Sequence, residues 1–351
     1  MKLVVFGLSV SSSWGNGHAV LWRALIRSLG AQGHCTVFFE RDVSYYAENR
    51  DLTALPGGSL ILYRDWCEIA VEAKRQLAEA DTAIVTSYCP DALAAAELVF
   101  SGRALRVFYD LDSPVTLARV SSGEPVAYLH PAGLAGFDLV LSYAGGGALT
   151  ALRECLGAHR IAPLYGCVDP DRYQPAPPPG GTRAALSYLG TYAEDRQSGL
   201  TQLFLEPAQQ RPKWRFIIGG AQYPEGFPWL PNIFFERHVS PSAHPRFYAA
   251  ARSTLNVTRA AMAACGWCPS GRLFEAAACA TPMLSDWWDG LDEFFVPGKE
   301  IIVARTTEDV LAALELSDRE LAAIGAAARE RALTEHSSDR RALELTRLLG
   351  R

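Results

Sequence analysis

The residues from 268 to 286 combine types that suit the binding of a nucleotide-linked ligand. This segment reads CPSGRLFEAAACATPMLSD. Ser270 can cap a helix that begins at Gly271, and the first-turn N–H groups of such a helix lack partners and attract anions. Arg272 adds charge-assisted hydrogen-bond donors for a diphosphate, and the Glu275 carboxylate can accept hydrogen bonds from both hydroxyls of a ribose. The structural alternative for Glu275 is a surface residue paired with Arg272 three positions earlier.

Polar residues and glycines also follow the predicted strands of the C-terminal half. The positions expected to contact the phosphates or the sugar of a donor are Gly190, Arg196, Asn256, Arg259, Asp289 and Gly290. In open α/β sheets, ligands bind outside the carboxyl ends of the strands, where these residues are predicted to lie. A charge-assisted arginine–phosphate contact is worth roughly 1.5–3 kcal/mol. The alternatives are an exposed helix arginine beside Asp195 for Arg196, and a structural ion pair for Arg259.

A second glycine-bearing turn follows the first predicted strand, 3–8. Its residues are Trp14, Gly15, Asn16, Gly17 and His18. The glycines and the helix that follows suit an acceptor or a sugar, whereas the structural alternative is a tight turn with a solvated His18. Val20 replaces the third glycine of a dinucleotide fingerprint, and Glu40 matches its acidic residue only approximately. A nicotinamide site is therefore disfavoured.

Two carboxylates, Asp110 and Asp112, follow the predicted strand 105–109. Residues two apart on an extended segment point the same way, so either one could bind acceptor hydroxyls or act as a base. His18 is the other residue that could orient or deprotonate the acceptor. No histidine or third carboxylate follows at a metal-ligand spacing, so we predict no metal site. The alternative is that Asp112 caps a helix or turn before Ser113 and Pro114.

Alternating strand and helix patterns are expected to position these residues. The predicted strands of the N-terminal half are 3–8, 36–39, 60–63, 83–86, 105–109, 139–143 and 161–164, and its helices are 18–29, 67–80, 91–100 and 147–156. The predicted strands of the C-terminal half are 185–189, 216–218, 233–236, 254–257, 283–285 and 301–304, and its helices are 195–209, 245–252, 271–279, 308–314, 318–333 and 338–349. Nearly continuous apolar strands joined by helices are typical of parallel sheets covered on both faces.

A proline-rich stretch, 168–182, divides the chain. It reads VDPDRYQPAPPPGGT, and proline fixes φ and lacks an N–H, so the stretch cannot be an internal strand or a helix. We predict an α/β protein with a Rossmann-like acceptor-side domain over 1–167, this linker, and a Rossmann-like donor domain over 183–335. The two doubly wound domains are expected to face each other across a cleft. His336, near the start of the last helix, is expected to face solvent.

Bulk composition narrows the functional class. Lys and Arg number 33 against 38 Asp and Glu, a net charge of −5 without a long basic run, which argues against a nucleic-acid partner. The apolar run at 3–8 is too short for a signal peptide or a membrane span, so we predict a cytoplasmic protein without a transmembrane segment. The 8 cysteines are expected to be reduced thiols. Cys265 and Cys268 form a C-x-x-C pair, but no second pair completes a zinc set.

The C-terminal segment is also recognisable as a whole. PSGRLFEAAACATPMLSD, followed by GLDEFFVPGKEIIVA, resembles the nucleotide-sugar-binding segment of group 1 glycosyltransferases, and more narrowly the CgeB-like branch. WGNGHA, VFYDLDSPVTL, VDPDRY and LSYLGTYAEDRQ are consistent with that branch, so the resemblance covers nearly the whole chain. It implies a GT-B fold, a metal-independent reaction, and a donor nucleotide held by the C-terminal domain.

Carried over by position, Glu275 matches the ribose-binding glutamate of the family. Many relatives carry a second glutamate near the sugar, eight residues earlier, and here Trp267 occupies that position. This departure bears on how the sugar is held and on the retaining mechanism that the family implies. The last helix of such folds often returns to the N-terminal domain, which we expect for residues 336–351.

The sequence therefore predicts a glycosyltransferase without a bound cofactor. Its expected partners are a nucleotide-sugar donor, with UDP favoured, and a small-molecule, glycan or lipid acceptor. Two alternatives remain open, namely a non-catalytic nucleotide- or carbohydrate-binding protein on the same fold, which Trp267 favours, and a sugar-nucleotide epimerase. A dehydrogenase is a more distant alternative.

Overall fold

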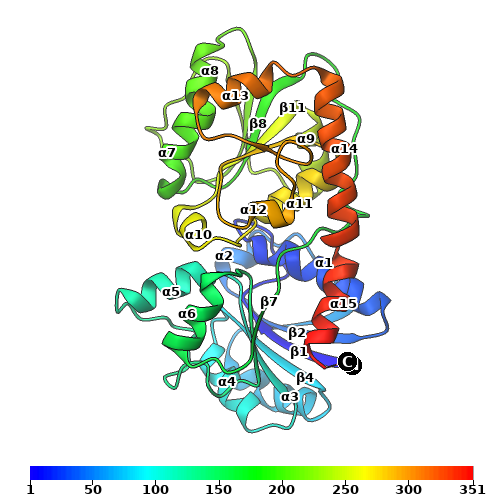
Figure 1. Ribbon diagram of the computed structural model, residues 1–351. Helices are drawn as coiled ribbons and strands as arrows, with labels where there is room; N and C mark the ends of the chain where they lie inside the picture. The colour runs from blue at the N-terminus through cyan, green and yellow to red at the C-terminus, as the bar shows by residue number, and fades with distance from the viewer. Residues whose placement is uncertain (351) are drawn as a thin grey trace. The chain divides into compact units, whose positions relative to one another are not determined.

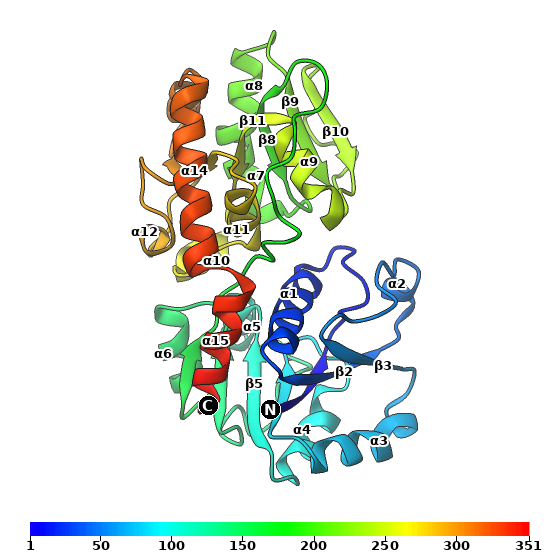
Figure 2. The same ribbon diagram turned by 90° about the vertical axis from the view of Figure 1, so that its right-hand side faces the viewer.

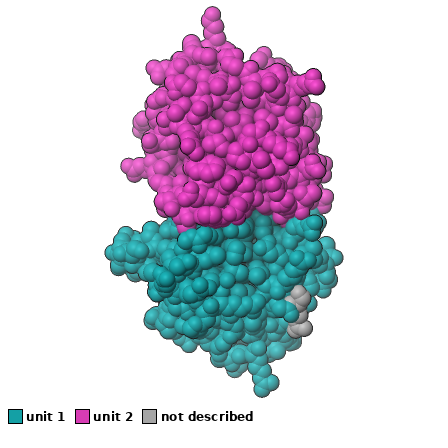
Figure 3. All heavy atoms as spheres, viewed as in Figure 1, with its two compact units in different colours: residues 1–167, 338–351 teal, residues 168–337 magenta. Residues whose placement is uncertain are grey.

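A computed structural model describes residues 1–350 of the chain (Figure 1, Figure 2). The chain folds into two compact units, which Figure 3 colours separately. Unit 1 consists of Met1–Cys167 and Ser338–Arg351, and unit 2 consists of Val168–Ser337. The break after Cys167 coincides with the start of the proline-rich stretch 168–182, which belongs to unit 2.

Unit 1 is built on a seven-stranded sheet in which every pairing is parallel. The strand order is β3-β2-β1-β4-β5-β6-β7. The strands are β1 (Lys2–Gly7), β2 (Cys35–Arg41), β3 (Gly58–Tyr63), β4 (Thr82–Thr86), β5 (Leu105–Asp110), β6 (Leu139–Ser142) and β7 (Ile161–Pro163). The helices are α1 (Gly17–Ala31), α2 (Ser44–Ala47), α3 (Trp66–Ala78), α4 (Ala92–Phe100), α5 (Ser113–Ser121), α6 (Gly147–Leu156) and α15 (Ser338–Leu348). The order reverses between β1 and β4, where such sheets form a ligand crevice.

Hydrophobic cores cover both faces of this sheet. Along β1, Leu3 and Val5 join one core, while Val4 and Phe6 join the other, because successive side chains of a strand point to opposite faces. Helix α15 lies beside α1 and contributes Leu345 to the first of these cores (Figure 1). The last helix of the chain therefore packs within unit 1.

Unit 2 repeats this architecture with a six-stranded, all-parallel sheet of order β10-β9-β8-β11-β12-β13. The strands are β8 (Ala184–Leu189), β9 (Phe216–Gly220), β10 (Ile233–Arg237), β11 (Ala251–Asn256), β12 (Met283–Ser285) and β13 (Ile302–Val303). The α-helices are α7 (Gln197–Leu200), α8 (Glu206–Gln210), α9 (His244–Ala249), α10 (Ala260–Cys265), α11 (Gly271–Ala278), α12 (Leu291–Phe294), α13 (Thr307–Leu314) and α14 (Asp318–Glu335). Short 3-10 turns, η1 (Glu194–Arg196) and η3 (Pro241–Ala243), and a π-helical turn, η2 (Thr201–Leu205), complete the unit. The predicted fold of two doubly wound α/β domains is confirmed.

The structure corrects several predicted elements. The helix predicted over 195–209 is divided into η1, α7, η2 and α8, and the π-helical turn η2 comes just before Pro207, whose missing N–H interrupts the regular helical bonding. The helix predicted over 245–252 ends at Ala249, and Arg252 already lies in β11. Four helices of four to nine residues, α2, α5, α10 and α12, are too short for the periodicity that sequence analysis relies on.

His336 does not face solvent, contrary to the prediction. It is 6% exposed and its ring lies among Phe274, Phe294 and Phe295. Its Nε2 lies 3.3 Å from the carbonyl oxygen of Phe294. The polar residues that follow it in the sequence gave no sign of these aromatic neighbours, which come from distant parts of unit 2.

Candidate functional site

The start of α11 is formed as the sequence predicts. The Ser270 side chain accepts a hydrogen bond from the backbone N–H of Arg272 and so caps the helix that begins at Gly271. The eight-residue helix has its last six residues buried, including Glu275, and its small alanines allow close packing. Its N-terminal N–H groups therefore have a fixed position from which to meet an anion.

Three predicted phosphate ligands, Arg196, Arg259 and Arg272, lie close enough to influence one another. Burial, together with the charges of Arg272 and Arg259, lowers the pKa of the Arg196 guanidinium. The Nε atoms of Arg196 and Arg272 are buried and have no hydrogen-bond partner among residues 1–350. Grouped cations with unused donors are expected where an anionic ligand completes the site.

The structure contradicts the alternative considered for Arg196 and confirms the ion pair considered for Arg259. Arg196 is not an exposed helix residue, since its Nε is buried and its Nη1 donates to the carbonyl oxygen of Thr191 at 3.2 Å. Arg259 does form an ion pair, with its Nε 3.1 Å from Asp195 Oδ2. Within residues 1–350, Asp195 is the one carboxylate that forms an ion pair with these three arginines, so positive charge remains in excess.

Glu275 is a buried residue with an elaborate set of partners. Its Oε2 lies 3.0 Å from His244 Nδ1 and accepts a hydrogen bond from the Tyr248 hydroxyl at 3.3 Å. Burial would raise the pKa of this carboxyl, but His244, Arg272 and the hydrogen bond from Tyr173 outweigh it and hold the pKa below its usual value. The surface pairing considered for Glu275 is therefore wrong, because the side chain points into unit 2.

The residues His244, Tyr248 and Tyr173 were not predicted as part of the site. They precede Glu275 by 31, 27 and 102 positions, and His244 and Tyr248 are carried by α9 on one helical face, four residues apart. Tyr173 comes from the proline-rich stretch and is 1% exposed. The spacing of His244 and Tyr248 is the only local sequence signal that points to them.

Asn256 and Gly190 are structurally engaged at the strand ends. The Asn256 amide donates to Thr258 Oγ1 at 3.2 Å and to Ser285 Oγ at 3.1 Å, which ties the ends of β11 and β12 together. The carbonyl oxygen of Gly190 accepts a hydrogen bond from Tyr223 at 3.1 Å. Gly190 follows β8 and Asn256 ends β11, and these adjacent strands mark the point where the strand order reverses.

Asp289 and Gly290 pack against the segment that carries Trp267. The backbone N–H of Trp267 donates to the carbonyl oxygen of Asp289 at 2.7 Å. Gly290 has a φ of +90°, and a Cβ at this position would lie 2.6 Å from the Trp267 indole. Trp267 itself adopts a φ of +43°, a strained value for a tryptophan. The contact between Gly290 and Trp267 and the hydrogen bond from Trp267 to Asp289 thus hold these two loops in one arrangement.

In unit 1, the buried carboxylate of Glu40 holds the turn after β1 in place. Glu40 accepts hydrogen bonds from the backbone N–H of Val10 at 2.7 Å and of Ser11 at 2.9 Å, and from the Ser9 hydroxyl at 2.9 Å. Glu40 is fully buried, so it is not available to a ribose, which agrees with the weak dinucleotide fingerprint. Farther along, Asn16 caps α1 by accepting from the N–H of His18 at 3.1 Å.

The remaining residues of this turn lie at its surface. Gly15 has a φ of +59°, which suits glycine, while a Cβ on Gly17 would meet open space. Trp14 is partly buried. Trp14, Gly15, Asn16 and Gly17 therefore form a turn whose backbone is fixed and whose outer side is open.

His18, Asp110 and Asp112 gather at the carboxyl ends of β1 and β5. His18 Nε2 lies 3.7 Å from Asp112 Oδ2, and the His18 ring packs on Tyr88 with centroids 5.7 Å apart. The expectation that the two aspartates point the same way is wrong. Asp110 is fully buried, whereas the Asp112 side chain is 23% exposed, because α5 begins directly after Asp112 and ends the extended segment.

Asp110 is chemically distinct from Asp112. Its Oδ1 accepts from Thr116 Oγ1 at 3.0 Å, while its Oδ2 is buried without a partner among residues 1–350. Burial raises the pKa of the Asp110 carboxyl to about 6. Asp112 stands at the N-cap position of α5, although its side chain makes no capping bond.

Several general properties of the described chain bear on its chemistry. Residues 1–350 contain no group of three or more His, Cys, Asp or Glu side chains arranged to hold a metal ion. None of the 8 cysteines, Cys265 and Cys268 included, forms a disulfide within the described residues. Over the same residues, none of the helices has the length and apolar character needed to cross a membrane.

Comparisons with known proteins give both a family match and a fold. Residues 196–347 match a family described as glycosyl transferase-like. Solved structures of similar fold include sucrose-phosphate synthase from Thermosynechococcus elongatus, at TM-score 0.71 and 12% identity over 99% of this chain and 98% of that chain. HepE from Anabaena, in complex with UDP-glucose, is similar at TM-score 0.70 and 13% identity, over 100% of this chain and 99% of that chain. The chain has the GT-B fold.

The family match covers residues 196–347, most of unit 2 and the last helix, while the solved structures, at 12% and 13% identity, show the fold of the whole chain. Trehalose-6-phosphate synthase is a further GT-B neighbour, at TM-score 0.68 and 11% identity, over 100% of this chain and 99% of that chain. No curated protein matches the chain. The family match begins at Arg196 and includes Arg259, Arg272 and Glu275, so all the predicted donor residues of this GT-B chain except Gly190 lie inside it.

Proposed function

We propose that this GT-B chain transfers a sugar from a nucleoside diphosphate sugar to a small-molecule, glycan or lipid acceptor, without a metal ion. The observation that carries the proposal is the arginine cluster beside α11, with buried, unused Nε donors on Arg196 and Arg272. Such donors can neutralise a diphosphate in place of a divalent cation. HepE, a structural neighbour, was solved with UDP-glucose, which supports UDP as the donor nucleotide.

In this proposal the arginines contribute to catalysis as well as to binding. When the bond between the sugar C1 and the diphosphate breaks, negative charge grows on the leaving oxygen. Arg196, Arg259 and Arg272, with the N–H groups at the start of α11, would stabilise that charge. Glu275 would hold the ribose, and its anionic state is maintained by His244 and Arg272.

The proposed acceptor residues lie in unit 1. His18 and Asp112, 3.7 Å apart, form a histidine–carboxylate pair of the kind that removes a proton from an attacking hydroxyl. The open outer side of the turn over Trp14–Gly17 would contact the acceptor or the sugar. Asp110 is buried beneath this surface, so we assign it to holding the start of α5 through Thr116 and withdraw it as a base.

The stereochemical outcome and the family branch belong to the same proposal. We assign the chain to the CgeB-like branch and expect retention of configuration, as the resemblance implies. Trp267 replaces the sugar-side glutamate of retaining relatives, so the anomeric configuration of the product is a direct test. An α-linked product from an α-linked donor, read from the anomeric proton coupling, means retention; a β-linked product refutes it.

A thermal-shift panel tests the donor site. UDP, GDP, dTDP, ADP and NAD are added to the wild type and to Glu275→Ala. A ligand at 100 times its Kd stabilises a protein by about 2.7 kcal/mol, so one nucleoside diphosphate should raise the midpoint clearly in the wild type and much less in the variant. A response to NAD alone, or to none of them, contradicts the proposal.

A non-catalytic binding protein is the second candidate, and Trp267 is the observation that favours it. The two candidates differ in turnover. Release of UDP from a panel of UDP-sugars, measured with and without candidate acceptors, is expected for the enzyme. Nucleotide binding without any release under these conditions would favour the binding protein.

A further inference from the structure

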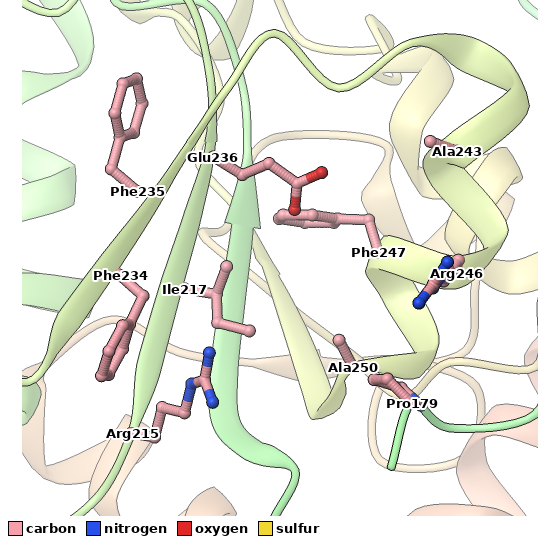
Figure 4. A pocket seen from close by; sticks show the side chains of 10 residues that line it. All are labelled: Pro179, Arg215, Ile217, Phe234, Phe235, Glu236, Ala243, Arg246, Phe247 and Ala250. Atoms are coloured by element: carbon pink, nitrogen blue, oxygen red, sulfur yellow. The ribbon is translucent and has the colours of Figure 1, made fainter. Parts of the chain in front are cut away.

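A groove of about 560 Å³ lies on the sheet face of unit 2 beside α9, away from the arginine cluster at α11 (Figure 4). No helix connects β9 to β10, so this face of the sheet edge has no helical cover apart from α9. The lining residues are Pro179, Arg215, Ile217, Phe234, Phe235, Glu236, Ala243, Arg246, Phe247 and Ala250. The volume is within the usual range for a small-molecule site.

The charged side chains of this groove have no ionic partner. Arg215 and Arg246 form no ion pair or side-chain hydrogen bond within residues 1–350, and the same holds for Glu236. Figure 4 shows the two arginines on opposite sides of the groove, with Glu236 toward one end. Two cations and one carboxylate leave the groove with a net positive charge. A ligand that complements this groove carries an anionic group for the two arginines and hydroxyls that can donate hydrogen bonds to Glu236.

Arg215 is held in place by an aromatic ring. Its guanidinium carbon lies 4.2 Å from the centroid of Phe234, a stacked arrangement that leaves the N–H edge free to donate. Phe234 is 46% exposed, and Ile217 and Phe247 add apolar surface between the two arginines. The groove thus combines a fixed guanidinium, a second cation and an apolar wall, which suits the C–H face of a sugar ring.

We propose that this groove is a second ligand site, separate from the donor site, for an anionic saccharide that carries a phosphate or a carboxylate. The anionic group would bind Arg215 and Arg246, and the hydroxyls would bind Glu236. The two sites share a helix. The residues His244 and Tyr248 of α9 contact Glu275, whereas Arg246 and Phe247 of the same helix line the groove.

Because α9 contributes to both sites, the variants that test the groove must leave this helix intact. A substitution at Phe247 would disturb the helix that holds Glu275, whereas Arg215 and Arg246 are exposed and can be changed without loss of buried contacts. Arg319, exposed on α14 and outside both sites, is a matched control. Arg272→Gln reports on binding in the donor site instead. The test therefore succeeds or fails independently of the proposed function.

Calorimetric titration with glucose 6-phosphate and with glucuronate provides the measurement. We expect at least one to bind at 0.15 M salt, and to bind at least tenfold more weakly in Arg215→Gln and in Arg246→Gln, with no change in Arg319→Gln or Arg272→Gln. Preference for one probe identifies phosphate or carboxylate as the anionic group. Glucose and inorganic phosphate are each expected to bind at least tenfold more weakly than the preferred probe.

Four results would overturn the proposal. The first is that neither charged saccharide binds the wild type. The second is that the preferred probe binds Arg215→Gln and Arg246→Gln as tightly as the wild type. The third is that binding is lost in Arg272→Gln, which would place the ligand at α11. Equal affinity for inorganic phosphate and the preferred probe would likewise reject a saccharide site, since it would mean that the arginines bind an ion alone.

Discussion

His244 Nδ1 and Glu275 Oε2 lie 3.0 Å apart in the interior of unit 2, and both side chains are about nine-tenths buried. The other ring nitrogen, Nε2, lies 3.3 Å from the carbonyl oxygen of Val239. Both ring nitrogens therefore lie within hydrogen-bond reach of an oxygen atom. The proposed ribose ligand is thus a buried carboxylate held by His244, which fixes the orientation of its side chain.

Breaking this pair from the histidine side should be costly. His244→Ala leaves the buried Glu275 carboxylate without this partner, and removing the partner of a buried charge typically costs about 3–5 kcal/mol. For a unit of this size, that corresponds to a fall of roughly 6–20 °C in the unfolding midpoint. Differential scanning calorimetry of the full chain checks it. His159→Ala, at an exposed position of unit 1, should stay within about 2 °C of the wild type.

Glu275→Gln offers the informative comparison with His244→Ala. It keeps the shape of the side chain and removes the buried charge, so no unpaired charge is left in the interior and we expect a smaller fall in the midpoint. A larger fall in Glu275→Gln than in His244→Ala would mean that the carboxylate serves the fold through contacts other than His244.

Asp110 should make the stability of unit 1 depend on pH. Burial raises the pKa of this carboxyl to about 6 from an ordinary value of 3.8, so the folded state holds the proton more tightly than the unfolded state. The resulting stability is fully present below pH 3.8 and is lost as the pH rises through about 6. Asp110→Asn imitates the protonated form, so at pH 8 we expect it to be more stable than the wild type by up to about 3 kcal/mol.

Unfolding midpoints at pH 5 and pH 8 check the Asp110 prediction. The difference between Asp110→Asn and the wild type should be about 3 kcal/mol at pH 8 and about half of that at pH 5, because the carboxyl of the unfolded chain is already ionised at pH 5. Glu124→Gln changes an exposed carboxylate of unit 1 and should show no such pattern. An equal effect at both pH values would mean that Asp110 is ionised throughout this range.

The strands were the most predictable part of this fold. Most of the predicted strands agree with the observed ones to within two residues at each end, because buried parallel strands are continuous apolar runs with clear limits. The helix predicted over 195–209 shows where this reasoning fails. Its apolar periodicity is helical, but Pro207 and the π-helical turn before it are local backbone effects that periodicity does not express.

The candidate site was predictable where its residues are adjacent in sequence. Ser270 at the cap and Arg272 in the first turn follow from helix chemistry alone. The partners of Glu275 do not, since His244 and Tyr173 come from separate segments and are brought to it by the fold. The burial of Asp110 was also missed, because an extended segment was expected where α5 begins.

Arg272→Gln should weaken UDP binding. The substitution removes one charge-assisted donor next to the start of α11, and such a contact is worth roughly 1.5–3 kcal/mol, which corresponds to about a 10- to 150-fold rise in Kd. Calorimetric titration of UDP measures it, with Arg319→Gln as the control at an exposed arginine of unit 2. An unchanged Kd in Arg272→Gln would remove this residue from the donor site.

Gly290→Ala should destabilise the loop that packs on Trp267. The new Cβ would lie 2.6 Å from the indole, and the φ of +90° is unfavourable for alanine. Gly298→Ala is a matched control, since its φ is +76° but no atom lies within 4 Å of the added Cβ. We expect about 1 kcal/mol from backbone strain in Gly298→Ala, and about 1–3 kcal/mol more in Gly290→Ala from the steric overlap.

The overlap in Gly290→Ala can be isolated with a second substitution. In the Trp267→Ala background the indole is absent, so Gly290→Ala should cost only the strain seen at Gly298. Chemical unfolding of the four proteins of this double-mutant cycle gives the coupling energy. A coupling near zero would mean that Gly290 is not positioned by Trp267.

His18→Ala should lower the rate of sugar transfer without changing the binding of UDP. General-base catalysis by a positioned histidine typically contributes 10²- to 10⁴-fold, so we expect kcat to fall by about that factor, and Asp112→Asn to lower it less because the histidine remains. The UDP Kd should stay within about twofold, since His18 belongs to unit 1 and the donor residues to unit 2. Steady-state transfer with a competent acceptor, beside calorimetric titration of UDP, separates the two effects, and His159→Ala controls for the loss of an imidazole. A normal kcat in His18→Ala would mean that another group, or water, accepts the proton from the acceptor hydroxyl.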